Sequence, residues 1–224
     1  MTAEALTLDL GNGAQVSGLW QKPAGATAVL VLAHGAGVGM THKSMAALAD
    51  GLAARRIATL RYNFLYMERG SGRPDAPALA HKAVRAAAAE GARRAGKLPL
   101  FAGGRSFGAR MTSQAQAAAA LEKVRGLVFF AWPLHPAGNP GTERAEHLQG
   151  VALPILFLQG TKDALAELAL LEQVIAGLGK RATLKLEEQA DHSFHVPAKS
   201  GRKDADVLNE ILDVARDWMM GVAG

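Results

Sequence analysis

Cysteine is absent from the 224 residues of this chain. Its absence excludes disulfide bonds, thiolate metal ligands and a cysteine nucleophile, and it favours a reducing compartment. No apolar run approaches the roughly 18 residues that a membrane-spanning helix needs. The first residues, Met1–Ala5, include an acidic residue and no basic one. We therefore expect neither a signal peptide nor a membrane span, and we expect a cytoplasmic protein.

Aromatic residues are also few, at 5% of the chain, although the net charge is +5. The basic residues are spread out, and short clusters such as Arg93-Arg94 fall near the ends of helical patterns, where cations interact favourably with the helix dipole. Because no aromatic residues accompany the basic ones, we expect no binding to nucleic acid. The 7 histidines show no metal-ligand spacing, so we expect no metal site and no cofactor.

Apolar patterning predicts a series of short strands. Apolar and polar residues alternate on both sides of Gly11-Asn12-Gly13, which predicts a hairpin whose turn needs positive φ. Apolar or alternating runs predict further strands at Ala28–Ala33, Ile57–Tyr62, Pro99–Ala102, Val124–Ala131, Pro154–Gln159 and Ala182–Glu187. The last of these alternates as an edge strand would.

Helical patterns lie between these strands. Thr41 is a good N-cap for a first helix that places Met45 and Leu52 on one stripe. Further helices are predicted at residues 78–95, 106–122, 143–149 and 165–178, and around Val207–Met219. Strands that alternate with helices after a hairpin predict an α/β fold, with a mostly parallel sheet and helices on both faces. Without a repeat or linker, we expect one domain over residues 1–224.

The strongest functional signal lies between Leu100 and Arg110. Gly104-x-Ser106-x-Gly108 has the form of a nucleophile elbow, a sharp turn from strand to helix whose glycines let backbone pack closely around the serine. A shuffled chain of this composition would contain the pattern roughly one time in ten. The alternative is a glycine-rich turn with an incidental serine.

Two later residues favour the catalytic interpretation, because they also follow strands of the predicted sheet, where sites in such sheets form. Asp163 follows a buried strand, and His192 lies in the loop after the last strand. A serine nucleophile needs a base to take its proton and a carboxylate to orient that base. We predict Ser106, His192 and Asp163 for these roles. Two alternatives stay open: Asp163 could cap a helix that starts at Ala164, and His195 competes with His192.

Acyl transfer also needs N–H donors for the developing oxyanion. We predict the backbone N–H of Phe107, directly after the nucleophile, and that of Ala36, with Gly37 as the alternative. Ala36 follows the strand Ala28–Ala33. His34 ends that strand, and we interpret it as a structural imidazole that holds the loop.

Other polar residues in these segments are less informative. We interpret Arg105 and Arg110 as surface or loop-bracing groups, although Arg105, beside the nucleophile, could also bind an anionic substrate. Asp191 is interpreted as a solvated loop residue. His135 lies between prolines, and the sequence leaves open whether it faces a pocket or solvent.

The chain resembles the α/β-hydrolase superfamily, and in particular its small dienelactone-hydrolase-like members. Its order of serine, aspartate and histidine is that of this superfamily. The branch it resembles includes the testis-expressed Tex-type proteins and a chromatin-complex subunit. The resemblance spans roughly Trp20 to Met219 and is carried by His34-Gly35-Ala36-Gly37, Arg61-Tyr62-Asn63-Phe64, Gly103-Gly104-Arg105-Ser106-Phe107-Gly108, Gly160-Thr161-Lys162-Asp163 and Asp191-His192-Ser193-Phe194.

The resemblance implies a serine hydrolase fold with Ser106, Asp163 and His192 as its triad. Dienelactone hydrolases proper use a cysteine nucleophile, so their substrate does not transfer to this chain. The segment between Ala131 and Pro154 is too short for the helical lid of a lipase. We therefore expect a minimal lid and an open pocket that accepts a small carboxylic ester or thioester.

The expected pocket is roofed by Trp132–Gly141 and Phe64–Asp75. Two other functions stay open at this stage. One is a non-catalytic interaction or scaffold protein, for which the resemblance to a chromatin-complex subunit argues, and the other is an acyltransferase that uses the same triad. We expect a small-molecule ester as the partner, and the sequence leaves the oligomeric state open, with a homodimer among the options.

Overall fold

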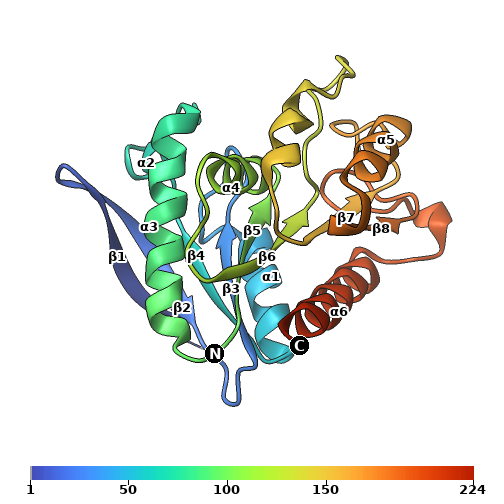
Figure 1. Ribbon diagram of the computed structural model, residues 1–224. Coiled ribbons are helices and arrows are strands. Elements are labelled where there is room, and N and C mark those ends of the chain that lie inside the picture. The colour runs from blue at the N-terminus through green and yellow to red at the C-terminus, as the bar shows by residue number, and fades with distance from the viewer. Residues whose placement is uncertain (1) are drawn as a thin grey trace.

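The computed structural model describes residues 2–224 of the chain, and eight strands form one sheet at its centre (Figure 1). The sheet order is β1-β2-β4-β3-β5-β6-β7-β8. Strands β1 and β2 are antiparallel to their neighbours, and β3 to β8 all run parallel. The strands are β1 Glu4–Gly11, β2 Ala14–Gln21, β3 Ala28–Ala33, β4 Ile57–Tyr62, β5 Leu100–Arg105, β6 Val124–Phe130, β7 Ile155–Gly160 and β8 Ala182–Glu187.

The predicted hairpin is confirmed as β1 and β2, at one edge of the sheet. Gly11, Asn12 and Gly13 all have positive φ, between 54° and 82°. Glycine and asparagine tolerate this conformation best. The sequence of the turn therefore sets where the chain reverses.

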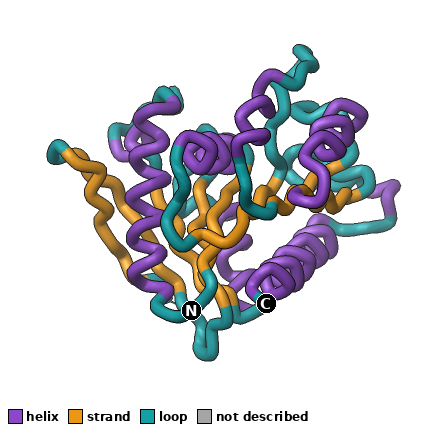
Figure 2. The backbone as a smooth tube through the Cα atoms, viewed as in Figure 1, coloured by secondary structure: helices purple, strands orange, loops and turns teal. Residues whose placement is uncertain are grey.

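Helices cover both faces of the sheet (Figure 2). The α-helices are α1 Lys43–Ala54, α2 Leu65–Glu68, α3 Pro77–Ala95, α4 Phe107–Ala118, α5 Leu168–Leu178 and α6 Asp204–Ala223, and the 3₁₀ helices are η1 Glu143–Gly150, η2 Gly179–Arg181 and η3 Ala198–Ser200. Buried residues of α3, α4 and α5 belong to one hydrophobic core, and those of α1 and α6 belong to the other. Among residues 2–224, no helix has the length and apolar character needed to cross a membrane.

Strand β3 shows how the two cores are divided. Val29 and Val31 pack with the α3 side, whereas Leu30 and Leu32 pack with the α1 side, because successive side chains of a strand point to opposite faces. The small residues of α3 let that helix lie close to the sheet. A Cβ on Gly91 would come within 2.5 Å of the Val31 side chain.

Several sequence predictions about helices were wrong in detail. The N-cap of α1 is His42, whose side chain accepts from the Ser44 amide, and not Thr41. The segment after β4, expected to be a loop, contains the short helix α2. Helix α4 ends at Ala118 rather than at Glu122, because residues 119–123 form a turn into β6.

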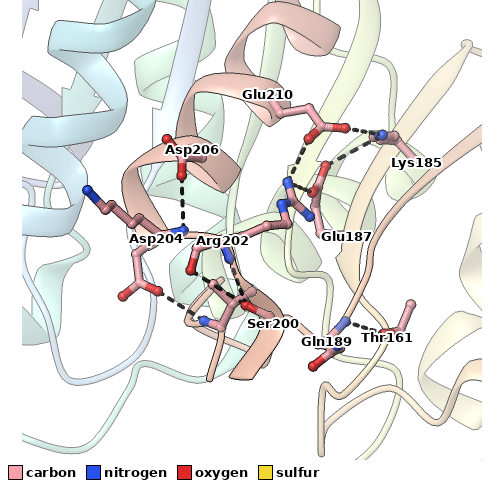
Figure 3. Close-up of polar contacts among 11 residues, drawn as sticks. Thr161, Lys185, Glu187, Gln189, Ser200, Arg202, Asp204, Asp206 and Glu210 are labelled. Atoms are coloured by element: carbon pink, nitrogen blue, oxygen red, sulfur yellow. Dashed lines mark hydrogen bonds and ion pairs between the residues drawn. The ribbon is translucent and has the colours of Figure 1, made fainter. Parts of the chain in front are cut away.

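A polar network fastens the end of β8 to α6 (Figure 3). Arg202 bonds the carboxylates of Glu187 at 2.9 Å and Glu210 at 2.6 Å. Lys185 bonds Glu210 and lies 3.7 Å from Glu187. The Glu187 side chain is only 1% exposed, so its charge depends on these two cations.

Removing Arg202 should therefore destabilise the fold. Arg202→Met leaves the buried Glu187 carboxylate with Lys185 alone, and we expect a loss of about 2 kcal/mol in the free energy of unfolding. The control is Arg93→Met, because that side chain is 67% exposed on α3 and its loss should leave the stability nearly unchanged. Denaturant unfolding measures both, and equal losses would contradict a structural role for the network.

Candidate active site

Ser106 lies on the sharp turn between β5 and α4, with φ 51° and ψ −118°. A positive φ is unusual for serine and costs free energy, and residues in such strained conformations cluster at functional sites. The flanking glycines make the turn possible. A Cβ on Gly104 would lie 2.6 Å from the carbonyl oxygen of Ala33, and one on Gly108 would lie 2.5 Å from that of His34. The end of β3 therefore packs directly against the elbow.

The three residues predicted as a triad lie in one hydrogen-bonded chain. Ser106 Oγ is 2.8 Å from His192 Nε2, and His192 Nδ1 is 2.7 Å from Asp163 Oδ2. Asp163 is buried, and the His192 side chain is 23% exposed. A neutral histidine that donates from Nδ1 to the carboxylate keeps a lone pair on Nε2, facing the serine. This geometry lets His192 accept the serine proton.

Gln159 holds Asp163 in place, and the sequence reading missed it. Its Nε2 donates to Asp163 Oδ2, and its Oε1 accepts from the Trp132 amide at 2.9 Å. Gln159 is fully buried near the end of β7. The available signal was a polar side chain at the carboxyl end of an otherwise apolar strand.

The alternative role considered for Asp163, capping the next helix, is wrong. Helix α5 begins at Leu168 with Glu167 as its N-cap. Asp163 Oδ1 instead accepts from the Leu165 amide at 2.8 Å. This bond orients the carboxylate, and Oδ2 accepts from both His192 and Gln159.

The competing histidine, His195, lies elsewhere. It is exposed, and its Nδ1 bonds Asp204 at 2.9 Å. Asp191, expected to be a solvated loop residue, accepts from the amides of Ser193 and His195 and so shapes the loop that carries His192.

The two predicted oxyanion donors line the same cleft as Ser106. This cleft has a volume of about 410 Å³, and Ala36 and Phe107 form part of its wall, whereas Gly37 does not. Among residues 2–224, the amides of Ala36 and Phe107 have no backbone acceptor. Both N–H groups are therefore available to a bound oxygen atom.

His34 is a structural residue, as expected. Its Nε2 accepts from the Phe64 amide at 3.1 Å, so Nδ1 carries the proton and donates to the Gly35 carbonyl at 2.8 Å. The ring is fully buried against Phe64 and Tyr66. This neutral imidazole joins the loop after β3 to the segment after β4.

His135 plays a similar part on the other side of the cleft. It is buried, donates to the Pro136 carbonyl and accepts from the Glu167 amide at 2.8 Å. Arg105, expected to be a surface or loop-bracing group, instead joins β5 to α1, because its guanidinium donates to Ser44 Oγ at 3.0 Å. Arg110 differs from the expectation, since it lines the cleft and braces no loop.

The segments expected to roof the pocket do reach it. Pro133 and Pro136 line the cleft from one of them, and Pro74 and Asp75 from the other. Within residues 2–224, no cluster of three or more histidine, aspartate or glutamate side chains could hold a metal ion.

Comparison with known proteins agrees with this geometry. A family model described as an alpha/beta hydrolase domain matches residues 26–220. The chain belongs to this α/β hydrolase family. The expected resemblance to the superfamily, and to its dienelactone-hydrolase-like branch, is therefore confirmed.

Solved structures share the α/β hydrolase fold over almost their full length. A dienelactone hydrolase from Anabaena variabilis is 22% identical with a TM-score of 0.77, and the match covers 98% of this chain and 97% of that one. An α/β serine hydrolase without lid from Xanthomonas campestris is 24% identical with a TM-score of 0.73, covering 97% and 95%. An alpha-beta serine hydrolase homologue from Coxiella burnetii is 20% identical with a TM-score of 0.74, covering 95% and 97%.

The close packing at the elbow predicts a large effect for Gly108→Ala. The added methyl group collides with the His34 carbonyl, so we expect a loss of about 1–3 kcal/mol in stability and a displaced loop around Ala36. Gly221→Ala is the matched control, because nothing lies within 4 Å of its Cβ position on α6, and it should be neutral or slightly stabilising. Thermal unfolding of both variants distinguishes them, and a stable Gly108→Ala protein would contradict the packing argument.

Protonation of His34 should destabilise the fold in acid. Burial lowers the pKa of His34 to about 4, whereas histidine in an unfolded chain has a pKa of about 6.5. Between these values the unfolded state binds more protons, so stability falls as the pH falls, by about 3 kcal/mol in all for this residue.

Denaturant unfolding of the wild type and of His34→Gln, from about pH 7 to about pH 4.5, measures this effect. The variant lacks the titrating ring, so the difference in stability between the two proteins should narrow as the pH falls. A constant difference across the range would show that His34 does not titrate in this way.

Proposed function

We propose that this protein is a serine hydrolase that cleaves a small carboxylic ester or thioester through a covalent acyl-enzyme. The observation that carries the proposal is the chain of contacts from Ser106 Oγ to His192 Nε2, at 2.8 Å, and from His192 Nδ1 to Asp163 Oδ2, at 2.7 Å. Hydrogen bonds between nucleophile and base, and between base and an orienting acid, are what acyl transfer by serine requires.

In the first half of the reaction, Ser106 Oγ attacks the carbonyl carbon of the ester while its proton passes to His192 Nε2. Asp163 stabilises the resulting imidazolium. The backbone N–H groups of Ala36 and Phe107 donate to the oxyanion, and each such donor typically contributes about 2.7–4 kcal/mol to transition-state stabilisation. The tetrahedral intermediate then collapses, and His192 gives its proton to the departing alcohol or thiol.

In the second half, water attacks the acyl-enzyme carbonyl and gives a proton to His192 Nε2. The new oxyanion occupies the same two N–H donors. Collapse of this intermediate breaks the bond to Ser106 Oγ, and the proton returns to the serine. The products are a carboxylic acid and the alcohol or thiol released earlier, so the protein is unchanged.

The cleft favours small substrates. Its volume of about 410 Å³ lies near the lower end of the usual range for ligand pockets, about 300–1,000 Å³. Its walls include the apolar side chains of Pro74, Pro133, Pro136 and Leu165. Short acyl groups fit this space better than long lipid chains.

Labelling with a fluorophosphonate probe tests the proposal. The probe bonds covalently to an activated serine, so the wild type should be labelled and Ser106→Ala should not. Ser113→Ala is the matched control. Ser113 Oγ also lies 2.8 Å from a histidine, Nε2 of His147, but no carboxylate among residues 2–224 bonds that ring, and Ser113 is fully buried. Ser113→Ala should therefore remain labelled.

Hydrolysis of a panel of short-chain esters and thioesters gives the second measurement. The wild type should release acid from at least one of them, and Ser106→Ala should lose this activity by a factor of about 10³ or more. Equal labelling of wild type and Ser106→Ala, or activity unaffected by the substitution, would overturn the mechanism.

A further inference from the structure

Two arginines in the wall of the cleft have no partner. Arg110 on α4 and Arg144 on η1 both line the space beside Ser106. Within residues 2–224, neither guanidinium forms a hydrogen bond to another side chain or backbone group, or an ion pair. Arg110 Nε is fully buried without any acceptor. The Phe107 ring lies 6.0 Å from the Arg110 guanidinium.

Three other half-buried arginines of the chain are paired with carboxylates. Arg55 bonds Asp213, Arg94 bonds Glu4 and Glu90, and Arg202 bonds Glu187 and Glu210. Burying a cation without a partner is costly. The guanidinium groups of Arg110 and Arg144 have no such carboxylate, so their unpaired state needs an explanation that these three arginines do not.

The surroundings of the two arginines are electropositive. Burial lowers the pKa of Arg110, and the charge of Arg144 lowers it further. Burial, followed by the charge of Arg110, lowers the pKa of the neighbouring His147 to about 4, so this ring stays neutral at pH 7. The acid that lines the cleft, Asp75, accepts from the Tyr66 amide at 3.0 Å and pairs with neither arginine.

Both arginines lie close enough to Ser106 to contact a substrate bound in the same cleft. The Arg110 amide donates to the Ser106 carbonyl at 3.1 Å, so Arg110 lies one helical turn beyond the serine. Side chains four residues apart on a helix are neighbours, with Cβ atoms about 5–6 Å apart. Helix η1, the unlabelled yellow turn beside α4 in Figure 1, brings Arg144 to the same wall. Pro133, Pro136 and Leu165 form an apolar surface in the same cleft.

We propose that Arg110 and Arg144 bind an ionised acid group on the substrate, so that the preferred ester is a small one with a second, free carboxylate, such as the half-ester of a dicarboxylic acid. Guanidinium groups bind carboxylates through paired, charge-assisted hydrogen bonds. The apolar wall accommodates the short hydrocarbon spacer between the carboxylate and the ester. This inference rests on the proposed hydrolase function and names its substrate class.

The reaction itself is the hydrolysis already described. Ser106 takes the acyl group and the alcohol leaves with a proton. Water then hydrolyses the acyl-enzyme and releases the carboxylic acid. The free carboxylate takes no part in bond making or breaking. Its binding orients the ester carbonyl toward Ala36 and Phe107, which increases kcat/KM for the charged substrate over a neutral one.

The test compares monomethyl glutarate with dimethyl glutarate, which differ in the free carboxylate. The wild type should have a higher kcat/KM for the half-ester, per ester bond. Arg110→Gln and Arg144→Gln should each reduce this preference about tenfold, the usual effect of one charge-assisted contact. Arg73→Gln is the control, because it removes the same charge from an exposed position next to Pro74, and the preference should not change.

The outcomes separate the two proposals. If both esters are hydrolysed and neither arginine variant changes the preference by more than about twofold, the substrate assignment is wrong while the hydrolase function stands. If no ester is hydrolysed and no probe binds, the hydrolase function fails. Calorimetry then still tests whether the two arginines bind an anion. Glutarate should bind to the Ser106→Ala protein, and this binding should be lost in the double variant Ser106→Ala, Arg110→Gln.

A structural role for Arg110 predicts a different result. If Arg110 only supported the fold, Arg110→Gln would lower the thermal midpoint. Because its buried charge is unpaired, we expect an unchanged or higher midpoint in the absence of ligand. A lower midpoint together with an unchanged substrate preference would overturn the proposal.

Discussion

The packing of the elbow against the end of β3 is the constraint on which the site depends. Gly104 and Gly108 leave no room for a side chain between the elbow and the carbonyl groups of Ala33 and His34. This contact holds Ser106 at a positive φ and places the loop that contains Ala36 beside it. Backbone packing therefore positions Ser106 next to the loop of Ala36, and the His34 side chain, bonded to the Gly35 carbonyl and the Phe64 amide, holds that loop in place.

The sequence predicts the strands well, because their apolar residues are continuous and their ends are marked by glycine, proline or polar residues. Strands β3, β4 and β8 have the predicted bounds. The elbow and the positions of Asp163 and His192 follow from the order of strands in a parallel sheet, since sites form at the carboxyl ends of such strands. Ala36, predicted as an oxyanion donor, lies in the wall of the cleft beside Ser106.

Features that depend on tertiary contacts were not predictable in this way. In the sequence, Gln159 is simply the last residue of a predicted strand. The fold shows that its side chain connects Asp163 to the Trp132 amide. The sequence pattern predicts only that Arg110 lies on a helix. Its position in the cleft is decided by η1 and by the segment of prolines before it, which close over that face of α4.

Strand β8 is at the edge of the sheet and bonds only to β7, yet the loop that follows it carries His192. Edge strands open more readily than central strands, and their amide hydrogens exchange faster, because half of their backbone groups lack a sheet partner. The Ser106–His192 contact therefore joins the turn after a central strand, β5, to the loop after an edge strand. The ion pairs of Arg202 with Glu187 and Glu210 tie this edge to α6, so the position of His192 depends on contacts far from the elbow that holds Ser106.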